Sequence, residues 1–166
     1  MSWPDLVLRS AQPRDLDALE SFELLVFSDL EQRISRRQWA YLVARGGGRT
    51  VMAEDGGGRL LGVLVLSHRR DGRSLRVYSL GVHPAARRQG VARRLLEHAL
   101  AYAGRRGFER VSLEVGRENR GAVALYRAMG FSSVGTLRHY YGLGEDALRM
   151  ECPVIAAAAG RPSRVR

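Results

Sequence analysis

The stretch "VHPAARRQGVARRLLEHAL", residues 82–100, decides the fold, because the end of a strand, a basic glycine turn and a helix follow one another within it. Arg87, Arg88 and Gly90 stand where the helix begins, although that end of a helix already carries partial positive charge. Backbone N–H groups that converge at such a turn bind anions, and glycine lets an anion approach the backbone closely. The stretch therefore predicts a phosphate-binding turn, with a solvated basic turn as the alternative.

The two most familiar nucleotide-binding signatures are absent from the sequence. There is no Gly-x-Gly-x-x-Gly, and neither copy of "GGGR", at 46–49 and 56–59, is followed by Lys-Ser or Lys-Thr. These two glycine runs therefore indicate flexible turns rather than phosphate loops.

Apolar periodicity predicts alternating strands and helices along the chain. The order strand–helix–strand–helix–strand from Ser74 to Leu137 implies a right-handed crossover and at least one parallel strand pair. Ser35 and Asn119 are expected helix N-caps, and Gly130 is expected to end a helix. The sequence thus predicts a mixed α/β sheet with helices on both faces. Strands are expected at 6–10, 49–55, 59–69, 74–82, 109–115, 131–141 and 146–154, and helices from 13 and at 34–44, 90–105 and 119–129.

The composition indicates a cytoplasmic protein with an anionic partner. The 166 residues carry a formal net charge of +10, and the 27 lysine and arginine positions are all arginine. Such a surface attracts nucleotide-like cofactors, nucleic acid or acidic peptides. The single cysteine, Cys152, excludes an internal disulfide and suits a reducing compartment. The N-terminus lacks the pattern of a secretion signal, and the apolar run "PVIAAAAG" (153–160) is too short to span a membrane.

Three sequence blocks resemble the GCN5-related N-acetyltransferases, the GNAT superfamily. "RRQGVA" (87–92) is similar to the family signature Gln/Arg-x-x-Gly-x-Gly/Ala, and "LEVGRENRGAVALYRAMGF" (113–131) resembles its second motif, Asn-x-x-Ala-x-x-Leu-Tyr-x-x-x-Gly-Phe. "HYYGLGEDALRM" (139–150) resembles the final hairpin of enzymes that acetylate protein N-termini, such as the bacterial ribosomal-protein-alanine acetyltransferases of the RimI type. The resemblance covers residues 5–152. It predicts a GNAT domain at 1–152, followed by a flexible basic tail at 153–166.

This resemblance implies a GNAT fold, with a mostly antiparallel mixed sheet of about seven strands, helices on both faces and a parallel pair splayed at the cofactor site. It also implies acetyl-coenzyme A as cosubstrate, without a metal, and direct attack by a primary amine in a ternary complex. The turn would hold the pyrophosphate, and the strand end would run beside the pantetheine arm and bind the carbonyl oxygen. The cofactor-binding residues implied are Leu80, Gly81, Val82, Arg87, Arg88, Gln89, Gly90, Val91, Ala92, Asn119 and Tyr126.

Glu114 and Tyr126 are the candidate catalytic residues. Glu114 lies near the C-terminal end of a strand, where ligands bind in open α/β sheets, but an ion pair with an arginine is an equally good interpretation of the residue. Tyr126 shares a helix face with Leu125 and Met129, so its position alone favours a core aromatic. The resemblance implies that Glu114 is a general base, acting directly or through water. It implies that Tyr126 protonates the departing coenzyme A thiolate.

The acceptor is the least determined part of the prediction. Tyr140 and Tyr141 are adjacent, so in a strand their side chains would point to opposite faces, and the resemblance implies that they bind the acceptor, a protein N-terminal α-amine. Segment 27–39 does not match the substrate-groove motifs of those enzymes, which leaves a small amine (a polyamine, amino acid or antibiotic) as an alternative. A basic nucleic-acid-binding module is a second alternative. No histidine has metal-ligand spacing with Cys152, and we expect a monomer or homodimer with no membrane partner.

Overall fold

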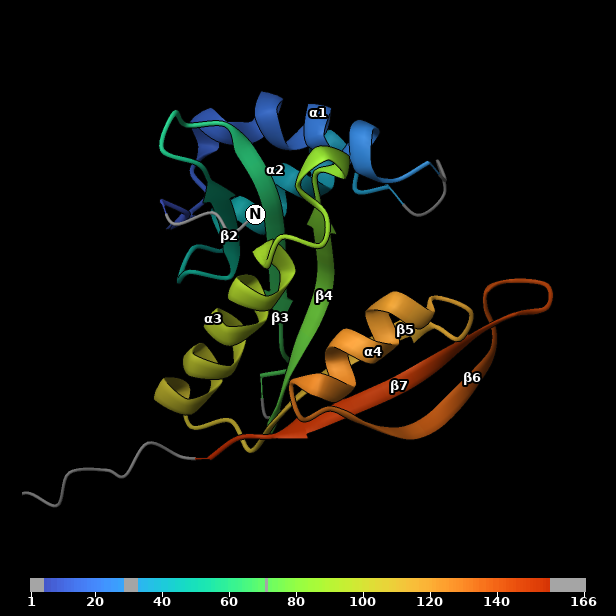
Figure 1. The fold of residues 1–166 in the computed structure, drawn as a ribbon. Coiled ribbons are helices and arrows are strands. Elements are labelled where there is room, and N and C mark those ends of the chain that lie inside the picture. The colour runs from blue at the N-terminus through green and yellow to red at the C-terminus, as the bar shows by residue number, and fades with distance from the viewer. Residues whose placement is uncertain (1–4, 29–32, 71, 156–166) are drawn as a thin grey trace, which may run out of the picture. The chain divides into compact units, whose positions relative to one another are not determined.

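A computed structural model describes residues 5–28, 33–70 and 72–155 of the chain. Seven strands form the sheet, in the order β1-β2-β3-β4-β5-β7-β6 (Figure 1). The chain divides into two compact units, one comprising Met1–Ser67 and Arg76–Ala99 and the other comprising His68–Leu75 and Leu100–Arg166. Residues 156–166 of the predicted tail lie outside the described residues.

The first unit contains four strands that pair with their neighbours in sequence order. β1 pairs with β2, β2 with β3 and β3 with β4, and all three pairs are antiparallel. The predicted glycine turn between β2 and β3 is confirmed: Asp55 accepts hydrogen bonds from the backbone N–H groups of Gly57 and Arg59, each at 2.9 Å. The strands are β1 (Val7–Ser10), β2 (Thr50–Glu54), β3 (Leu60–Ser67) and β4 (Ser74–Val82).

Two helices, α1 (Leu16–Val26) and α2 (Arg36–Ala44), cover one face of this sheet. Trp39, only 1% exposed, and Leu19 pack in a cluster with Met52, Val63 and Val65 of the strands beneath. The expected N-cap at Ser35 is confirmed, because its side chain accepts a hydrogen bond from the backbone N–H of Gln38. A 3₁₀ turn, η1 (Pro13–Asp15), precedes α1, so the helix begins three residues later than the sequence predicts.

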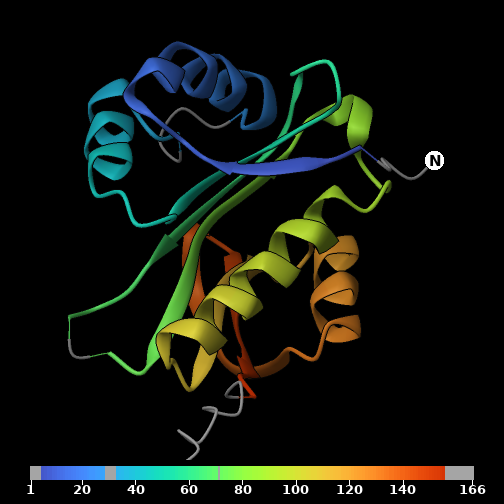
Figure 2. The same cartoon turned by 90° about the vertical axis from the view of Figure 1, so that its left-hand side faces the viewer.

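The third helix, α3 (Val91–Arg106), begins on the opposite face of the same strands (Figure 2). Gly62 of β3 alternates with Val63, so the two positions face opposite sides of the sheet. A Cβ atom at Gly62 would lie 2.8 Å from Val91 Cγ1 and 2.9 Å from Leu95 Cδ1. The first two turns of α3 therefore lie so close to the sheet that a side chain at Gly62 would displace them. Helices thus cover both faces of this unit, as expected.

The second unit is built from the end of α3, three strands and one further helix. β5 (Arg110–Gly116) pairs with β7 (Glu145–Pro153), and β7 pairs with β6 (Ser132–Gly142); both pairs are antiparallel. Helix α4 (Arg120–Ala128) lies beside these strands in Figure 1. β5 alternates between buried and half-buried residues, and Leu113 and Val115 are among the buried ones.

The predicted elements agree with the structure to within a few residues. The fold class, an α/β fold with a mixed and mostly antiparallel sheet of about seven strands, is confirmed. The last strand ends at Pro153, one residue beyond the predicted domain boundary. The boundary at residue 152 and the splaying of a parallel strand pair stay predictions.

We expect Gly62→Val to destabilise the protein by about 1–3 kcal/mol, because an extra side chain must push apart buried Val91 and Leu95. Gly135→Val is the matched control: Gly135 also lies in a strand, but a Cβ there would meet no atom within 4 Å. This control should change stability by less than about 0.5 kcal/mol. Urea unfolding measures the stability of both variants. Equal losses of stability in the two variants would contradict the close packing of α3 on Gly62.

Candidate active site

The end of β4 supplies the backbone of the first predicted group. Gly81 pairs with Val63 of β3. Nearer the start of β4, the β3–β4 pairing skips Tyr78, so the register of the two strands shifts there by one residue. Gly81 is buried under the end of α1: a Cβ there would lie 3.2 Å from Phe27 Cε2 and 3.3 Å from Phe22 Cε1. A side chain at this position would push against the end of α1. The predicted backbone segment 80–82 is therefore fixed on one edge by β3 and on one face by α1.

The turn that follows β4 has a strained backbone. A 3₁₀ turn, η2 (Pro84–Ala86), begins it, and His83 Nδ1 accepts a hydrogen bond from the backbone N–H of Ala85 at 3.0 Å. Desolvation and the nearby Arg59 guanidinium lower the pKa of His83 below its ordinary value, which favours the neutral ring that this bond requires. Arg88 (φ +60°) and Gly90 (φ +86°) both adopt left-handed backbone conformations. For arginine this conformation is uncommon, and such strain concentrates at functional sites.

Helix α3 begins directly after this turn, at Val91. Its first turn contains no acidic residue, and Arg87 and Arg88 are both exposed. The first N–H groups of any helix lack intrahelical acceptors. Gln89 is held over the turn, because its side-chain amide donates to Ala85 O at 3.2 Å. The predicted group at 87–92 therefore offers hydrogen-bond donors and positive charge at one place in the first unit.

Glu114 lies on β5 in the second unit, directly opposite Arg149 of β7. Its side chain is only 7% exposed, and Arg149 Nη2 lies 3.3 Å from Glu114 Oε1. The ion-pair interpretation of Glu114 is thus confirmed, while its role as a base stays a prediction. The sequence analysis did not predict Arg149 as the partner of Glu114. The two residues are directly opposite each other in the antiparallel pairing of β5 and β7, so this partner could be predicted only with the register of the two strands.

Tyr126 is buried on α4, as its helix position suggests. Its ring packs against Phe131 with 5.9 Å between the ring centroids. Burial, and to a smaller extent the charge of Tyr141, raises the pKa of Tyr126 to about 12. The phenol therefore stays protonated at neutral pH and is a hydrogen-bond donor.

Both ends of α4 are capped by residues of the second family-like motif. Asn119 Oδ1 accepts a hydrogen bond from the backbone N–H of Ala122, so the predicted N-cap is confirmed. At the other end, Gly130 has φ +98°. The N–H of Phe131 donates to Tyr126 O at 3.0 Å and that of Gly130 donates to Arg127 O at 3.1 Å, the two bonds of a Schellman cap. The glycine and phenylalanine of the motif thus end the helix directly after Tyr126.

The expectation that Tyr140 and Tyr141 point to opposite faces of a strand is wrong. Their rings meet edge to face, with 4.9 Å between the centroids. His139, directly before the two tyrosines, has a φ of +55°, and the pairing register of β6 shifts between Leu137 and Gly142, so this part of the strand is irregular. His139 N–H donates to Asp146 Oδ1 at 3.0 Å, which fixes this irregular segment to the other side of the hairpin.

Within the second unit the structure brings several predicted residues together. The hydroxyl of Tyr141 donates to the backbone oxygen of Glu114 at 3.4 Å, and Tyr141 also influences Tyr126 electrostatically. Among the described residues, no group of three potential metal ligands occurs, and no helix is long and apolar enough to cross a membrane. A metal-free reaction and a cytoplasmic location stay predictions.

A protein-family profile described as Acetyltransferase (GNAT) family matches residues 15–131. Ribosomal protein bS18-alanine N-acetyltransferase of Escherichia coli is 37% identical over 81 residues, which are 47% of this chain and 55% of the relative. N-alpha-acetyltransferase RimI of Mycobacterium tuberculosis is 43% identical over 99 residues, 57% of this chain and 60% of the relative. The chain thus spans little more than half the length of these curated relatives.

Solved structures match nearly the whole chain. The Escherichia coli ribosomal-protein-S18-alanine N-acetyltransferase superposes with a TM-score of 0.76 at 25% identity, covering 94% of this chain and 98% of the other. Nourseothricin acetyltransferase superposes with a TM-score of 0.71 at 28% identity, covering 91% and 99%.

We expect Tyr126 to make the folded protein less stable at alkaline pH. A raised pKa in the folded state means that the folded state holds the phenol proton more tightly, so stability falls as pH rises from about 10, the unfolded value, through about 12. We expect the free energy of unfolding to decrease by about 2 kcal/mol less in Tyr126→Phe than in the unaltered protein as the pH rises. The free energy of unfolding is measured by urea unfolding at a series of pH values between 9 and 11.5. Tyr41→Phe, at a residue that is 67% exposed, is the control and should leave the fall unchanged.

Proposed function

This chain belongs to the acetyltransferase (GNAT) family, and from that premise we propose that it transfers an acetyl group from acetyl-coenzyme A to the α-amine at the N-terminus of a protein. The observation that carries the proposal is the family match over residues 15–131, which includes both the strained turn at 87–92 and the doubly capped helix α4. The names of the Escherichia coli and Mycobacterium tuberculosis relatives, both N-acetyltransferases that act on alanine or an α-amine, support an α-amine as the acceptor.

The turn after β4 fits the diphosphate of acetyl-coenzyme A. The diphosphate is an anion that needs several donors, and the turn offers first-turn amides of α3 with Arg87 and Arg88 beside them. The left-handed conformations of Arg88 and Gly90 shape a backbone concavity of the kind that binds anions. The backbone of Leu80, Gly81 and Val82 would run beside the pantetheine arm and donate to the acetyl carbonyl oxygen. The remaining cofactor contacts proposed are Gln89, Val91, Ala92, Asn119 and Tyr126.

The acceptor must lose a proton before or while its nitrogen attacks the thioester carbon. An α-amine has a pKa near 8, about 2 units below a lysine side chain, so a single carboxylate is sufficient as the base. We assign this role to Glu114, acting directly or through water, and Arg149 Nη2 lies 3.3 Å from its Oε1. Tyr140 and Tyr141, which contact each other on the β6 side of the hairpin, would bind the peptide near its amino end.

Tyr126 would complete the transfer. As the new C–N bond forms, the C–S bond breaks and the sulfur leaves as a thiolate. The Tyr126 hydroxyl is protonated at all working pH values, since burial raises its pKa to about 12. A thiol has an ordinary pKa near 8.5, so the phenol serves mainly by donating a hydrogen bond that stabilises the departing sulfur. The caps at both ends of α4 hold this hydroxyl in place.

The second candidate function is acetylation of a small amine. It is favoured by the similarity to nourseothricin acetyltransferase and by segment 27–39, which does not match the substrate-groove motifs of enzymes that acetylate protein N-termini. Residues 29–32 of that segment lie outside the described residues. Both candidates use the same groups for acetyl transfer, so only the acceptor distinguishes them.

An acceptor screen separates the two candidates. We expect thiol release from acetyl-coenzyme A with peptides that have a free N-terminal alanine, and none when the same peptides are N-terminally blocked but contain lysine. Mass spectrometry locates the acetyl group on the α-nitrogen. Turnover of spermidine or an aminoglycoside with no peptide turnover would contradict the proposed acceptor and favour the small-amine function.

Substitutions at the Glu114–Arg149 pair separate a base from a structural ion pair. We expect Glu114→Gln to lower kcat about 10²-fold or more near pH 7, and the loss to shrink above about pH 8, where the α-amine deprotonates unaided. Arg149→Gln breaks the same contact but keeps the carboxylate, so it should retain most of the activity. If both variants lose the same activity at every pH, Glu114 serves only as the partner of Arg149.

A further inference from the structure

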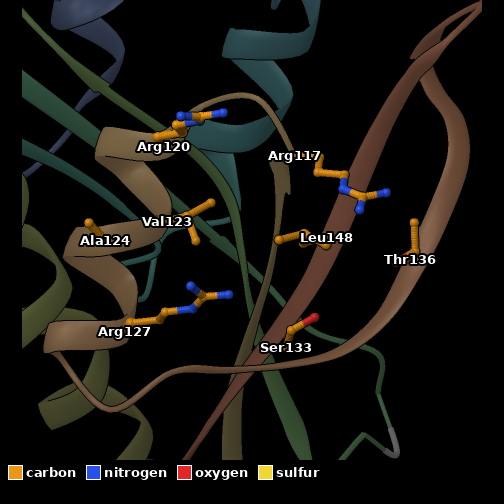
Figure 3. A pocket seen from close by; sticks show the side chains of 8 residues that line it. All are labelled: Arg117, Arg120, Val123, Ala124, Arg127, Ser133, Thr136 and Leu148. Carbon is orange, nitrogen blue, oxygen red and sulfur yellow. The ribbon is translucent and has the colours of Figure 1, made fainter.

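Apart from the acetyl transfer proposed above, we propose that the second unit carries a separate binding site for small molecules with two or more linked phosphate groups. The site is a pocket of about 500 Å³ between α4 and the β6–β7 hairpin (Figure 3). A volume of this size suits a nucleotide-sized ligand. Eight residues line the pocket: Arg117, Arg120, Val123, Ala124, Arg127, Ser133, Thr136 and Leu148.

Positive charge dominates this pocket. Arg120 and Arg127 project from α4, and Arg117 lies over the strands at the end of β5 (Figure 3). No carboxylate is among the lining residues. Across residues 5–28, 33–70 and 72–155, none of the three guanidinium groups forms an ion pair, although several other arginines of the chain do. Three cations that face one pocket repel one another, so an anion bound there would relieve the repulsion.

Two of these arginines also lie at an end of α4 where positive charge is unfavourable. Arg117 precedes α4 and Arg120 is its first residue, so both lie at the positive end of the helix dipole. The first turn of α4 contains no acidic residue that would offset them. Arg127, in contrast, lies in the last turn, where a cation is favourable. Phosphate groups between these side chains would satisfy both the arginines and the N-terminal end of the helix.

The pocket uses a different side of α4 from the one assigned to acetyl-coenzyme A. Arg120, Val123, Ala124 and Arg127 follow the i, i+3, i+4, i+7 spacing of one helix face. Asn119 and Tyr126, in the family-like motif, lie about a third of a turn away around the helix. The two ends of the pocket-lining face, at Arg120 and Arg127, are about 10 Å apart along the axis. The proposed ligand would therefore contact other residues than the acetyl donor does.

The density of positive charge in the pocket favours linked phosphates over the carboxylates of a peptide. Guanidinium groups bind phosphate through paired hydrogen bonds, and the hydroxyls of Ser133 and Thr136 are additional donors on β6. A linked phosphate chain concentrates several negative charges in the small volume that three arginines enclose, whereas the carboxylates of an acidic peptide are spread along an extended backbone. Val123, Ala124 and Leu148 provide an apolar surface for the uncharged remainder of the ligand.

Calorimetry with inorganic tripolyphosphate tests the proposal on the full chain, and substitutions within the pocket separate binding there from binding at the turn at 87–92. We expect saturable binding that weakens at least tenfold in each of Arg120→Gln and Arg127→Gln. Arg105→Gln is the matched control: it removes the same charge from an exposed arginine of the same unit outside the pocket, and should change Kd less than twofold. All three positions are exposed, so urea midpoints should match that of the unaltered chain.

Three results would overturn the proposal. Absence of tripolyphosphate binding would do so, and so would equal weakening by all three substitutions, which would indicate attraction to net charge alone. Tighter binding of a glutamate-rich peptide than of tripolyphosphate, with the same dependence on Arg120 and Arg127, would assign the pocket to an acidic polypeptide instead. None of these results depends on acetyl transfer, which the acceptor screen tests separately.

Discussion

The first unit depends on the absence of a side chain at Gly62. Because β3 presents no Cβ there, Val91 and Leu95 of α3 reach the sheet, and the helix begins immediately beyond the end of β4. Eight residues connect β4 to α3, and Arg88 and Gly90 among them adopt left-handed conformations. The strained turn thus lies directly before the turns of α3 that pack against the sheet. The same packing orients the N–H groups of the first turn of α3, which are the donors that an anion needs.

In the second unit, the motif around Tyr126 has a structural explanation apart from chemistry. Asn119 caps the start of α4, Gly130 supplies the left-handed residue that ends it, and Phe131 packs on the Tyr126 ring. A helix of nine residues is too short to be stable alone, so these caps and contacts determine whether it forms. The residues that resemble a cofactor motif are thus also the ones that fix the position and burial of the Tyr126 hydroxyl.

Most elements could be predicted from the sequence because their signals are local. Ser35 and Asn119 cap helices within three residues of themselves, and the turn between β2 and β3 is closed by Asp55 next to it. The errors and omissions come from contacts between distant residues. The Glu114–Arg149 pair requires the register of two strands. The ring contact between Tyr140 and Tyr141 occurs in an irregular part of β6, where His139 donates a hydrogen bond across the hairpin to Asp146. The catalytic and binding roles of the candidate residues stay predictions.

The two basic regions differ in how they present their donors, and this difference explains why only one has a sequence signature. At 87–92 the donors are mainly backbone N–H groups, which converge only if particular residues adopt left-handed conformations, so glycine must stand at a fixed position. In the α4 pocket the donors are long side chains and hydroxyls from one loop, one helix face and one strand. Flexible arginines reach a common ligand from many backbone positions, so no fixed spacing is required. Motifs therefore reveal anion sites made by the backbone, whereas sites made by side chains become visible only when the fold brings those side chains around one cavity.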